Sequence, residues 1–314
     1  MSTEPIDYRK YLDPTVLARI SGLELRARMA VEGFFSGMHR SPHLGLSVEF
    51  ADHRVYTQGD DLRHIDWKVF GKTDKYYIKE YEQEANLSLM LVVDASESMN
   101  YRSSDELLTK YDYAASLAAA MAYLTLQQQD SVGLAIFDEH LKEFLRPSNT
   151  AHHWRVLIQD LSRQTGRAKT SVGRVLDELA ERLHQRMLVI LISDLFDDPD
   201  SIIKGIRHLR FRHHEIIVWN LWDPAELRLP YRGPTMFEGL ESAGRLLVDP
   251  RSLRQRYLAE VEHFRQLLRV SCGQMHVDFM SFDTSTALDV ALSGYLATRS
   301  ARMRKRSSRV LGRG

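Results

Sequence analysis

The chain has 314 residues with 42 Lys or Arg and 42 Asp or Glu, so its formal net charge is zero and no global field favours nucleic acid or a membrane surface. Its 44% hydrophobic content is enough to bury a large core, and its single cysteine, Cys272, excludes a disulfide framework within the chain. No segment reaches the roughly eighteen apolar residues of a bilayer span, and the N-terminus lacks signal-peptide regions, so we expect a cytoplasmic protein.

Residues 1–85 differ in character from the rest of the chain. Leu23 to Phe35 fits one amphipathic helix, and Ser36 to Tyr81 is dense in charged and aromatic residues. Opposite charges interleave there, which favours an ion-pair network that clamps the segment to the main domain for specificity. A second acidic metal site at Asp60 and Asp61 is the alternative. We therefore predict an N-terminal helix and a segment that packs on the main domain.

A short apolar run, Leu87 to Val93, predicts a strand buried on both faces of a parallel sheet. Asp94, Ser96 and Ser98 follow it directly, at the carboxyl end where open α/β sheets place their ligands. Because these oxygen-bearing side chains alternate, a tight loop can turn all three toward one point. One carboxylate and two hydroxyls suit Mg²⁺, which prefers oxygen ligands and needs few carboxylates, and Mn²⁺ suits them as well.

Two later features extend this pattern. Thr170 precedes a helical segment that begins near Val172, and Asp194 ends a second apolar run that starts at Met187. Together with the Asp-x-Ser-x-Ser turn, they resemble the metal-ion-dependent adhesion site of von Willebrand factor A domains, although Ser171 and Leu195 stand where many such domains carry Asp and Gly. The alternative is that these side chains only cap loops and bond backbone amides. The predicted metal ligands are Asp94, Ser96, Ser98, Thr170 and Asp194.

The rest of the chain alternates between helices and strands. Lys110 to Gln129 has helical periodicity, Ser131 to Phe137 predicts a strand, and Leu141 to Leu145 predicts its hairpin mate at the sheet edge, stopped by Pro147. The other predicted helices are His152 to Arg163, Val172 to Gln185, a helix that Pro199 precedes and that runs through Phe211, Arg251 to Val270 and Ala287 to Thr298. The other predicted strands are Ile216 to Leu221 and Val277 to Phe282. This order predicts an α/β fold over residues 86–298, a doubly wound and mainly parallel sheet with helices on both faces.

Two segments fall outside this alternation. Glycines and prolines interrupt residues 223–250, so we predict a loop with short strands there, of no assigned role. Residues 299–314 are rich in Arg and contain no acidic residue, which predicts a basic disordered tail.

The N-terminal segment carries a long motif with the spacing Glu-Phe, Arg-x-Tyr and Gly-Asp-Asp-x-Arg-x-Ile-Asp-Trp. Its residues are Glu49, Phe50, Arg54, Tyr56, Gly59, Asp60, Asp61, Arg63, Asp66 and Trp67. With this motif the chain resembles the bacterial domain-of-unknown-function 58 family from about Leu12 to about Leu296, with one mild departure at Gly71-Lys72-Thr73. The resemblance implies a von Willebrand factor A-like fold and, commonly, genomic pairing with a MoxR-type AAA+ ATPase. It implies no established reaction.

These patterns predict a non-enzymatic cytoplasmic binding module. The five predicted ligands would hold Mg²⁺ or Mn²⁺, and a carboxylate from a partner protein would complete the coordination. By resemblance, that partner is a MoxR-type AAA+ ATPase or a client that it remodels, with this chain as adaptor or cofactor. One alternative is a metal-dependent hydrolase that uses the same site, and another is binding of a polyanion or membrane surface through the basic tail.

Overall fold

The computed structural model describes Leu23, Arg26, Ala27, Ala30 and Val31 and residues 53–55, 76–79, 88–150, 152–163, 169–239 and 244–295. The chain forms two compact units, each with more contacts within itself than to the other. The larger unit comprises Met1–Arg40 and Leu87–Gly314, and the smaller comprises Ser41–Asn86. In the smaller unit, β1 (His53–Val55) pairs antiparallel with β2 (Tyr77–Lys79). The side chains of the ten-residue motif and the basic tail lie outside the described residues. The domain boundaries at residues 85 and 298 stay predictions.

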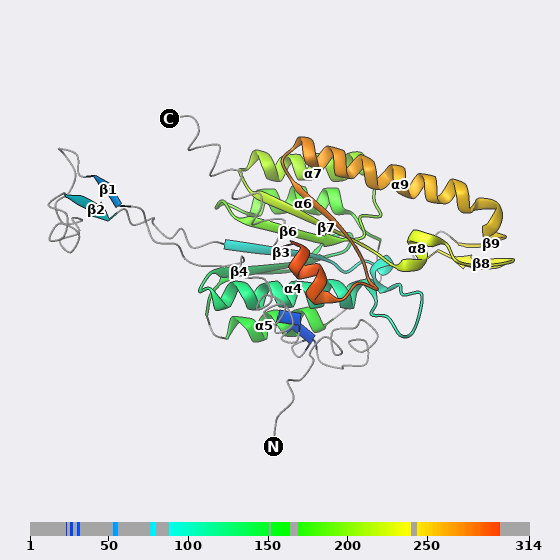
Figure 1. Ribbon diagram of the computed structural model, residues 1–314, viewed down its shortest axis with the longest axis horizontal. Helices are drawn as coiled ribbons and strands as arrows, with labels where there is room; N and C mark the ends of the chain where they lie inside the picture. The colour runs from blue at the N-terminus through cyan, green and yellow to red at the C-terminus, as the bar shows by residue number, and fades with distance from the viewer. Residues whose placement is uncertain are drawn as a thin grey trace, which may run out of the picture. The chain divides into compact units, whose positions relative to one another are not determined.

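The larger unit is built on a six-stranded sheet with the order β10-β7-β6-β3-β4-β5 (Figure 1). Its strands are β3 (Ser88–Asp94), β4 (Ser131–Phe137), β5 (Leu141–Ser148), β6 (Leu188–Ser193), β7 (Glu215–Trp222) and β10 (Asp278–Asp283). All neighbours pair in parallel except β4 and β5. From β3 the chain first builds outward through β4 and β5 and then continues on the other side with β6. The strand order therefore reverses between β3 and β6, and such a switch point opens a crevice at the carboxyl ends of the strands.

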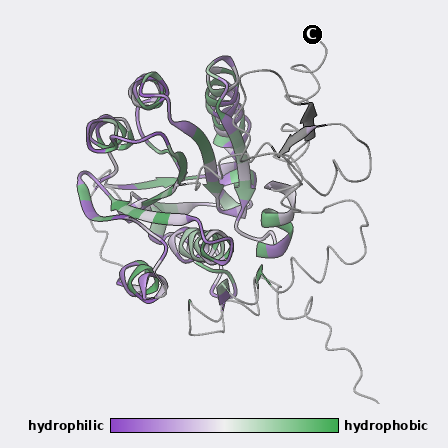
Figure 2. Cartoon of the chain, turned by 90° about the vertical axis from the view of Figure 1, so that its left-hand side faces the viewer, coloured by the Kyte–Doolittle hydropathy of each residue, from purple (hydrophilic) through white to green (hydrophobic). Residues whose placement is uncertain are grey.

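Helices cover both faces of this sheet. α4 (Lys110–Gln127) and α5 (His153–Ser162) lie on one face, while α6 (Val172–Arg182), α7 (Pro199–Phe211) and α9 (Pro250–Gln274) lie on the other (Figures 1 and 2). Residues 288–295 form a further helical segment. The predicted doubly wound, mainly parallel fold is confirmed.

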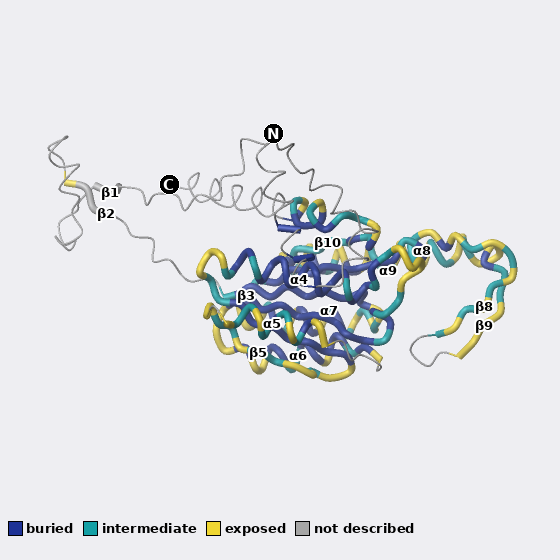
Figure 3. Tube along the Cα trace, turned by 90° about the horizontal axis from the view of Figure 1, so that it is seen from below, coloured by how far each residue is buried: buried dark blue, intermediate teal, exposed yellow. Residues whose placement is uncertain are grey.

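The alternation of side chains along β3 explains why both faces are covered. Leu91 and Val93 point into the core shared with α4, whereas Met90 and Val92 point into the core shared with α6 and α7. All four side chains are fully buried, and the central strands form the buried centre of the domain (Figure 3). Each apolar face of the sheet thus needs its own layer of helices, as the continuous apolar run indicates.

Two local predictions require correction. β5 does not stop at Pro147 but continues to Ser148, because β5 is an edge strand and proline is tolerated where no second neighbour needs its N–H. Residues 223–250 contain the predicted short strands, β8 (Thr235–Glu238) and β9 (Arg245–Val248), but they also contain a helix, α8 (Pro224–Arg228). None of the helices within the described ranges is long and apolar enough to cross a bilayer.

Candidate functional site

The turn after β3 brings together the first three predicted ligands. Asp94 ends the strand, and the short 3-10 helix η3 (Glu97–Asn100) turns the chain above the sheet. The backbone N–H of Ser96 donates to Asp94 Oδ1 at 2.9 Å, as in an Asx turn, and the hydroxyl oxygens of Ser96 and Ser98 lie 3.1 Å apart. The side-chain oxygens of these residues therefore gather within the one turn that closes over β3.

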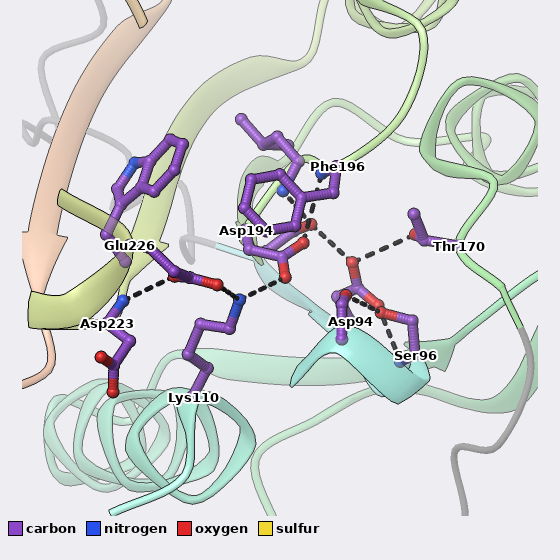
Figure 4. A network of polar contacts seen from close by, with 12 residues as sticks. Asp94, Ser96, Lys110, Thr170, Asp194, Phe196, Asp223 and Glu226 are labelled. Atoms are coloured by element: carbon purple, nitrogen blue, oxygen red, sulfur yellow. Dashed lines mark hydrogen bonds and ion pairs between the residues drawn. The ribbon is translucent and has the colours of Figure 1, made fainter. Parts of the chain in front are cut away.

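The Asp94 carboxylate is fully buried and is surrounded by hydroxyl donors (Figure 4). Thr170 Oγ1 donates to Asp94 Oδ2 at 3.2 Å, and Ser193 Oγ donates to the same oxygen at 2.5 Å. Burial and the nearby charge of Asp194 raise the pKa of Asp94 to about 7, although the hydrogen bonds from Ser193 and Ser96 oppose the rise. Neutral donors alone stabilise this buried charge poorly, and a cation beside it would lower the pKa again.

Thr170 reaches Asp94 from the loop before α6, and two backbone contacts fix this loop. The N–H of Ser171 donates to the carbonyl oxygen of Asp138, the residue that follows β4, at 3.2 Å. The N–H of Gly173, in the first turn of α6, donates to the Asp197 carboxylate at 3.4 Å. Thr170 itself is only 9% exposed. A side chain 76 residues from Asp94 in sequence is thereby held at its carboxylate.

Asp194 follows β6, the strand beside β3, and its position is fixed by a buried amide. Asn220 Nδ2, in β7, donates to the backbone oxygen of Asp194 at 2.9 Å. In the side chain, Oδ1 accepts from the backbone N–H of Phe196 at 3.2 Å, and Oδ2 accepts from Lys110 Nζ at 2.8 Å. Both carboxylate oxygens therefore have a donor, and one of these donors is a cation of the chain itself.

Lys110 is the fully buried first residue of α4. The helix dipole opposes a cation in the first turn, and burying an unpaired ammonium is costly. Asp194 and Glu226 offset both effects, since Glu226 Oε1 lies 2.6 Å from Nζ. Burial alone would lower the pKa of Lys110, but the attraction of the two carboxylates raises it above its ordinary value. Burial raises the pKa of Glu226 against the opposing effect of Lys110, and we treat both groups as ionised because the 2.6 Å contact joins them.

Glu226 is held in place by the capping box that begins α8. Its Oε2 accepts from the backbone N–H of Asp223 at 2.8 Å, and Asp223 Oδ1 accepts from the N–H of Ala225 at 2.7 Å. Asp223 Oδ2 also accepts from the N–H of Ser103 at 2.9 Å. These reciprocal bonds satisfy the free amides of the helix start. The short helix therefore orients a carboxylate toward the end of α4.

Phe196 lies against the Lys110 ammonium, with 4.6 Å between Nζ and the ring centroid. The preceding residue, Leu195, has a φ of 60°, a left-handed conformation that costs a residue with a side chain about 1 kcal/mol or more. Burial of Leu195 and the 2.8 Å bond from its N–H to Ser193 Oγ hold it there. This strained turn directs the Phe196 N–H to Asp194 and its ring to Lys110.

All five predicted ligands lie at the carboxyl edge of β3 and β6, but the structure gives them different partners. Asp94, Ser96, Ser98 and Thr170 form one group, whereas Asp194 belongs to the ion pair with Lys110. Across the residues that the structure describes, no three His, Cys, Asp or Glu side chains are placed to hold a metal ion. A site here therefore depends on hydroxyl oxygens. Whether it binds an ion stays a prediction.

Sequence analysis did not identify Lys110, Glu226 or Ser193 as part of this site. In the sequence, Lys110 is only the first residue of a predicted helix. Glu226 lies 116 residues later, in a helix that the sequence did not predict. For Ser193 a signal existed, because a hydroxyl residue ends an otherwise apolar strand directly before Asp194. Its contact with Asp94 required knowing that β3 and β6 are neighbours.

Comparison with solved structures gives distant similarities. The chain is similar to the conserved hypothetical protein BatB of Bacteroides thetaiotaomicron, with 13% identity and a TM-score of 0.44 over 69% of this chain and 99% of that one. It is also similar to the SpRpn10 VWA domain, with 10% identity and a TM-score of 0.39 over 66% of this chain and 93% of that one. The strand order described above is that of a doubly wound, mainly parallel α/β sheet, the fold class that the sequence predicts.

Sequence comparisons extend over a larger part of the chain. The uncharacterized protein Mb1516 of Mycobacterium bovis is 24% identical over 233 residues, which cover 73% of this chain and 72% of that protein. The uncharacterized protein Rv1480 of Mycobacterium tuberculosis matches to the same extent. The model of one family, described as protein of unknown function DUF58, matches residues 52–266, more than half of the chain. The chain therefore belongs to the DUF58 family.

Proposed function

We propose that this chain is a protein-binding module that recognises an acidic side chain of its partner through a divalent ion at the carboxyl edge of the sheet. The observation that supports it most strongly is the environment of Asp94. A fully buried carboxylate, with its pKa raised to about 7, accepts bonds from Thr170 and Ser193 at the strand switch point. A divalent ion would supply the charge that this arrangement lacks.

The donor set fits Mg²⁺ or Mn²⁺. Asp94 would contribute a carboxylate oxygen, and Ser96, Ser98 and Thr170 would contribute hydroxyl oxygens. Asp194 would act through its charge, because both of its oxygens already accept hydrogen bonds. One carboxylate neutralises only part of a divalent charge, and the ion would supply an electrophilic centre for an oxygen anion from outside. Such an ion would favour a partner that offers the carboxylate of an Asp or Glu side chain.

We further propose, from the family resemblance, that the partner is a MoxR-type AAA+ ATPase or its client. The chain would then act as an adaptor rather than as an enzyme. In support of a non-enzymatic role, Lys110 and Glu226, which lie next to the site, are paired with each other and are 0% and 14% exposed in their side chains. A general base needs a lone pair that can reach the substrate.

The test is an affinity capture from a lysate of the source cells, with the full chain as bait in Mg²⁺ and in EDTA. A Ser96→Ala, Ser98→Ala double variant removes two proposed ligands. A Ser103→Ala, Ser104→Ala double variant is the matched control, since both of those serines are exposed in the next loop.

We expect wild type and control to capture an AAA+ ATPase in Mg²⁺ only, and the Ser96, Ser98 variant to capture none, although its thermal unfolding shows a folded chain. Equal capture by all three proteins would show that binding of the ATPase does not require the metal site. Hydrolysis of a generic phosphoester or ester by the pure protein, abolished by Asp94→Ala, would establish the competing hydrolase function instead.

A further inference from the structure

A recess of about 530 Å³ opens beside the candidate metal site. Its walls come from the η3 turn, the loop after β6, α8, β8 and α9, so it uses the segment 223–250 to which the sequence assigned no role. The β8–β9 hairpin extends from the same end of the domain as α8 (Figure 1). The walls are mainly apolar and include the aromatic residues Tyr101, Phe196, Tyr231, Phe237 and Tyr257. The recess is large enough for one bulky side chain or more.

The walls of the recess are fixed by contacts within the chain. The hydroxyls of Tyr101 and Tyr231 lie 2.8 Å apart. Arg254, in α9, donates from Nε to the carbonyl of Leu229 at 3.0 Å and from Nη2 to the carbonyl of Tyr231 at 2.8 Å. The segment between α8 and β8 is therefore tied both to the η3 side and to α9. A recess formed in this way needs little reorganisation to accept a guest.

The charged groups in the walls already have partners, which determines the chemistry of the guest. Glu226 is bound by Lys110 and by the N–H of Asp223, and Glu238 accepts two bonds from Arg245 at 3.0 and 3.1 Å. A cationic guest would find no free carboxylate in these two residues, because Lys110 and Arg245 already bind them. The aromatic walls therefore favour an apolar guest.

The recess is continuous with the candidate metal site, because Ser98 belongs to both. Its hydroxyl lies 3.1 Å from that of Ser96, and the same residue lines the recess. A partner segment whose carboxylate reaches an ion at Ser98 would therefore lie beside the recess. The positive charge of the ion complements the carboxylate, and the aromatic walls complement an apolar neighbour.

We propose that this recess binds a large apolar side chain, preferably aromatic, that lies next to the metal-binding Asp or Glu in the same segment of the partner. The proposal rests on the proposed function and adds the chemical class of residue that gives it specificity. Burial of an aromatic side chain contributes about 1.5–3 kcal/mol. The expected gain in affinity is therefore about ten-fold or more.

The test uses a panel of labelled peptides with one Glu in a Gly-Ser background and one Phe at each flanking position in turn. Binding to the full chain in Mg²⁺ is followed by chemical-shift titration. The variant is Phe237→Ser, which removes a wall of the recess. The matched control is Leu247→Ser, because Leu247 is 63% exposed on the neighbouring strand β9 and does not line the recess. Tyr257→Ser, on α9, is the second variant if Phe237→Ser does not fold.

We expect at least one Phe position to bind about ten-fold tighter than the peptide without Phe. This gain should be lost in Phe237→Ser or Tyr257→Ser and kept in Leu247→Ser. The proposal is overturned if no Phe position gains affinity, or if the gain persists in the wall variants. The background peptide reports separately on the proposed function, since its binding should require Mg²⁺ and its Glu. If binding of the background peptide requires Mg²⁺ and Glu but no Phe position increases the affinity, the proposed metal site is supported and the recess proposal fails.

Discussion

The carboxyl edge of the sheet contains two buried aspartates, and the structure stabilises their charges in different ways. We call their surroundings the Asp94 half and the Asp194 half. In one half, the carboxylate of Asp94 is buried among hydroxyls and a backbone amide. In the other, the carboxylate of Asp194 is equally buried but pairs with the ammonium of Lys110, which Glu226 also binds. In the second half, one cation of the chain is shared by two carboxylates. The first half has no cation within hydrogen-bond distance among the described residues, and we propose that a cation from solution binds there.

The largest effect is expected from removing the internal cation. Lys110→Met should leave the two buried carboxylates, Asp194 and Glu226, without a partner and lower the free energy of unfolding by about 3–5 kcal/mol. Urea denaturation in EDTA measures this loss. Lys204→Met is the control, because Lys204 is exposed on α7. Adding Glu226→Gln to Lys110→Met should recover part of the loss. Equal stability of Lys110→Met and Lys204→Met would show that the ion pairs of Lys110 contribute little.

A smaller effect is expected in the Asp94 half. Ser193→Ala removes the hydroxyl that donates to Asp94 Oδ2, and a hydrogen bond to a buried charge is worth about 1.5–3 kcal/mol. The variant should lose that amount of unfolding free energy in EDTA. Ser285→Ala is the matched control, since Ser285 donates to Asp283 at 2.7 Å from an exposed position. A control that loses as much as Ser193→Ala would mean that burial of Asp94 adds nothing to this bond.

The fold was largely predictable from local patterns. The apolar runs that form β3, β4, β6 and β7 indicate buried strands, and the helix expected between Pro199 and Phe211 is present as α7, which includes Pro199 itself. The helix α8 was missed because five residues are too few for a period to show, and its local signals are only the capping box and Pro224 in its first turn. β5 is longer than predicted because an edge strand tolerates Pro147 where no second neighbour needs its N–H.

The site was predictable only where its residues are close together in sequence or stand at the end of a predicted strand. Asp94, Ser96 and Ser98 share one turn, and a strand end marks Asp194. Lys110 was not predictable in the same way, because its two partners are 84 and 116 residues away. Its unfavourable place at a helix N-terminus becomes informative only when the buried carboxylates are seen. Long-range charge pairing thus distinguishes Asp194, which is bound to Lys110, from Asp94, which is not.

The central claim is that the Asp94 half, and not the Asp194 half, needs a cation from solution. Electron paramagnetic resonance of Mn²⁺ added to the full chain measures free and bound ion directly. We predict that wild type and Glu226→Gln bind Mn²⁺, that Mg²⁺ displaces it, and that Asp94→Asn binds none while remaining folded. Binding that survives Asp94→Asn, or wild-type protein that binds no Mn²⁺, would contradict the account.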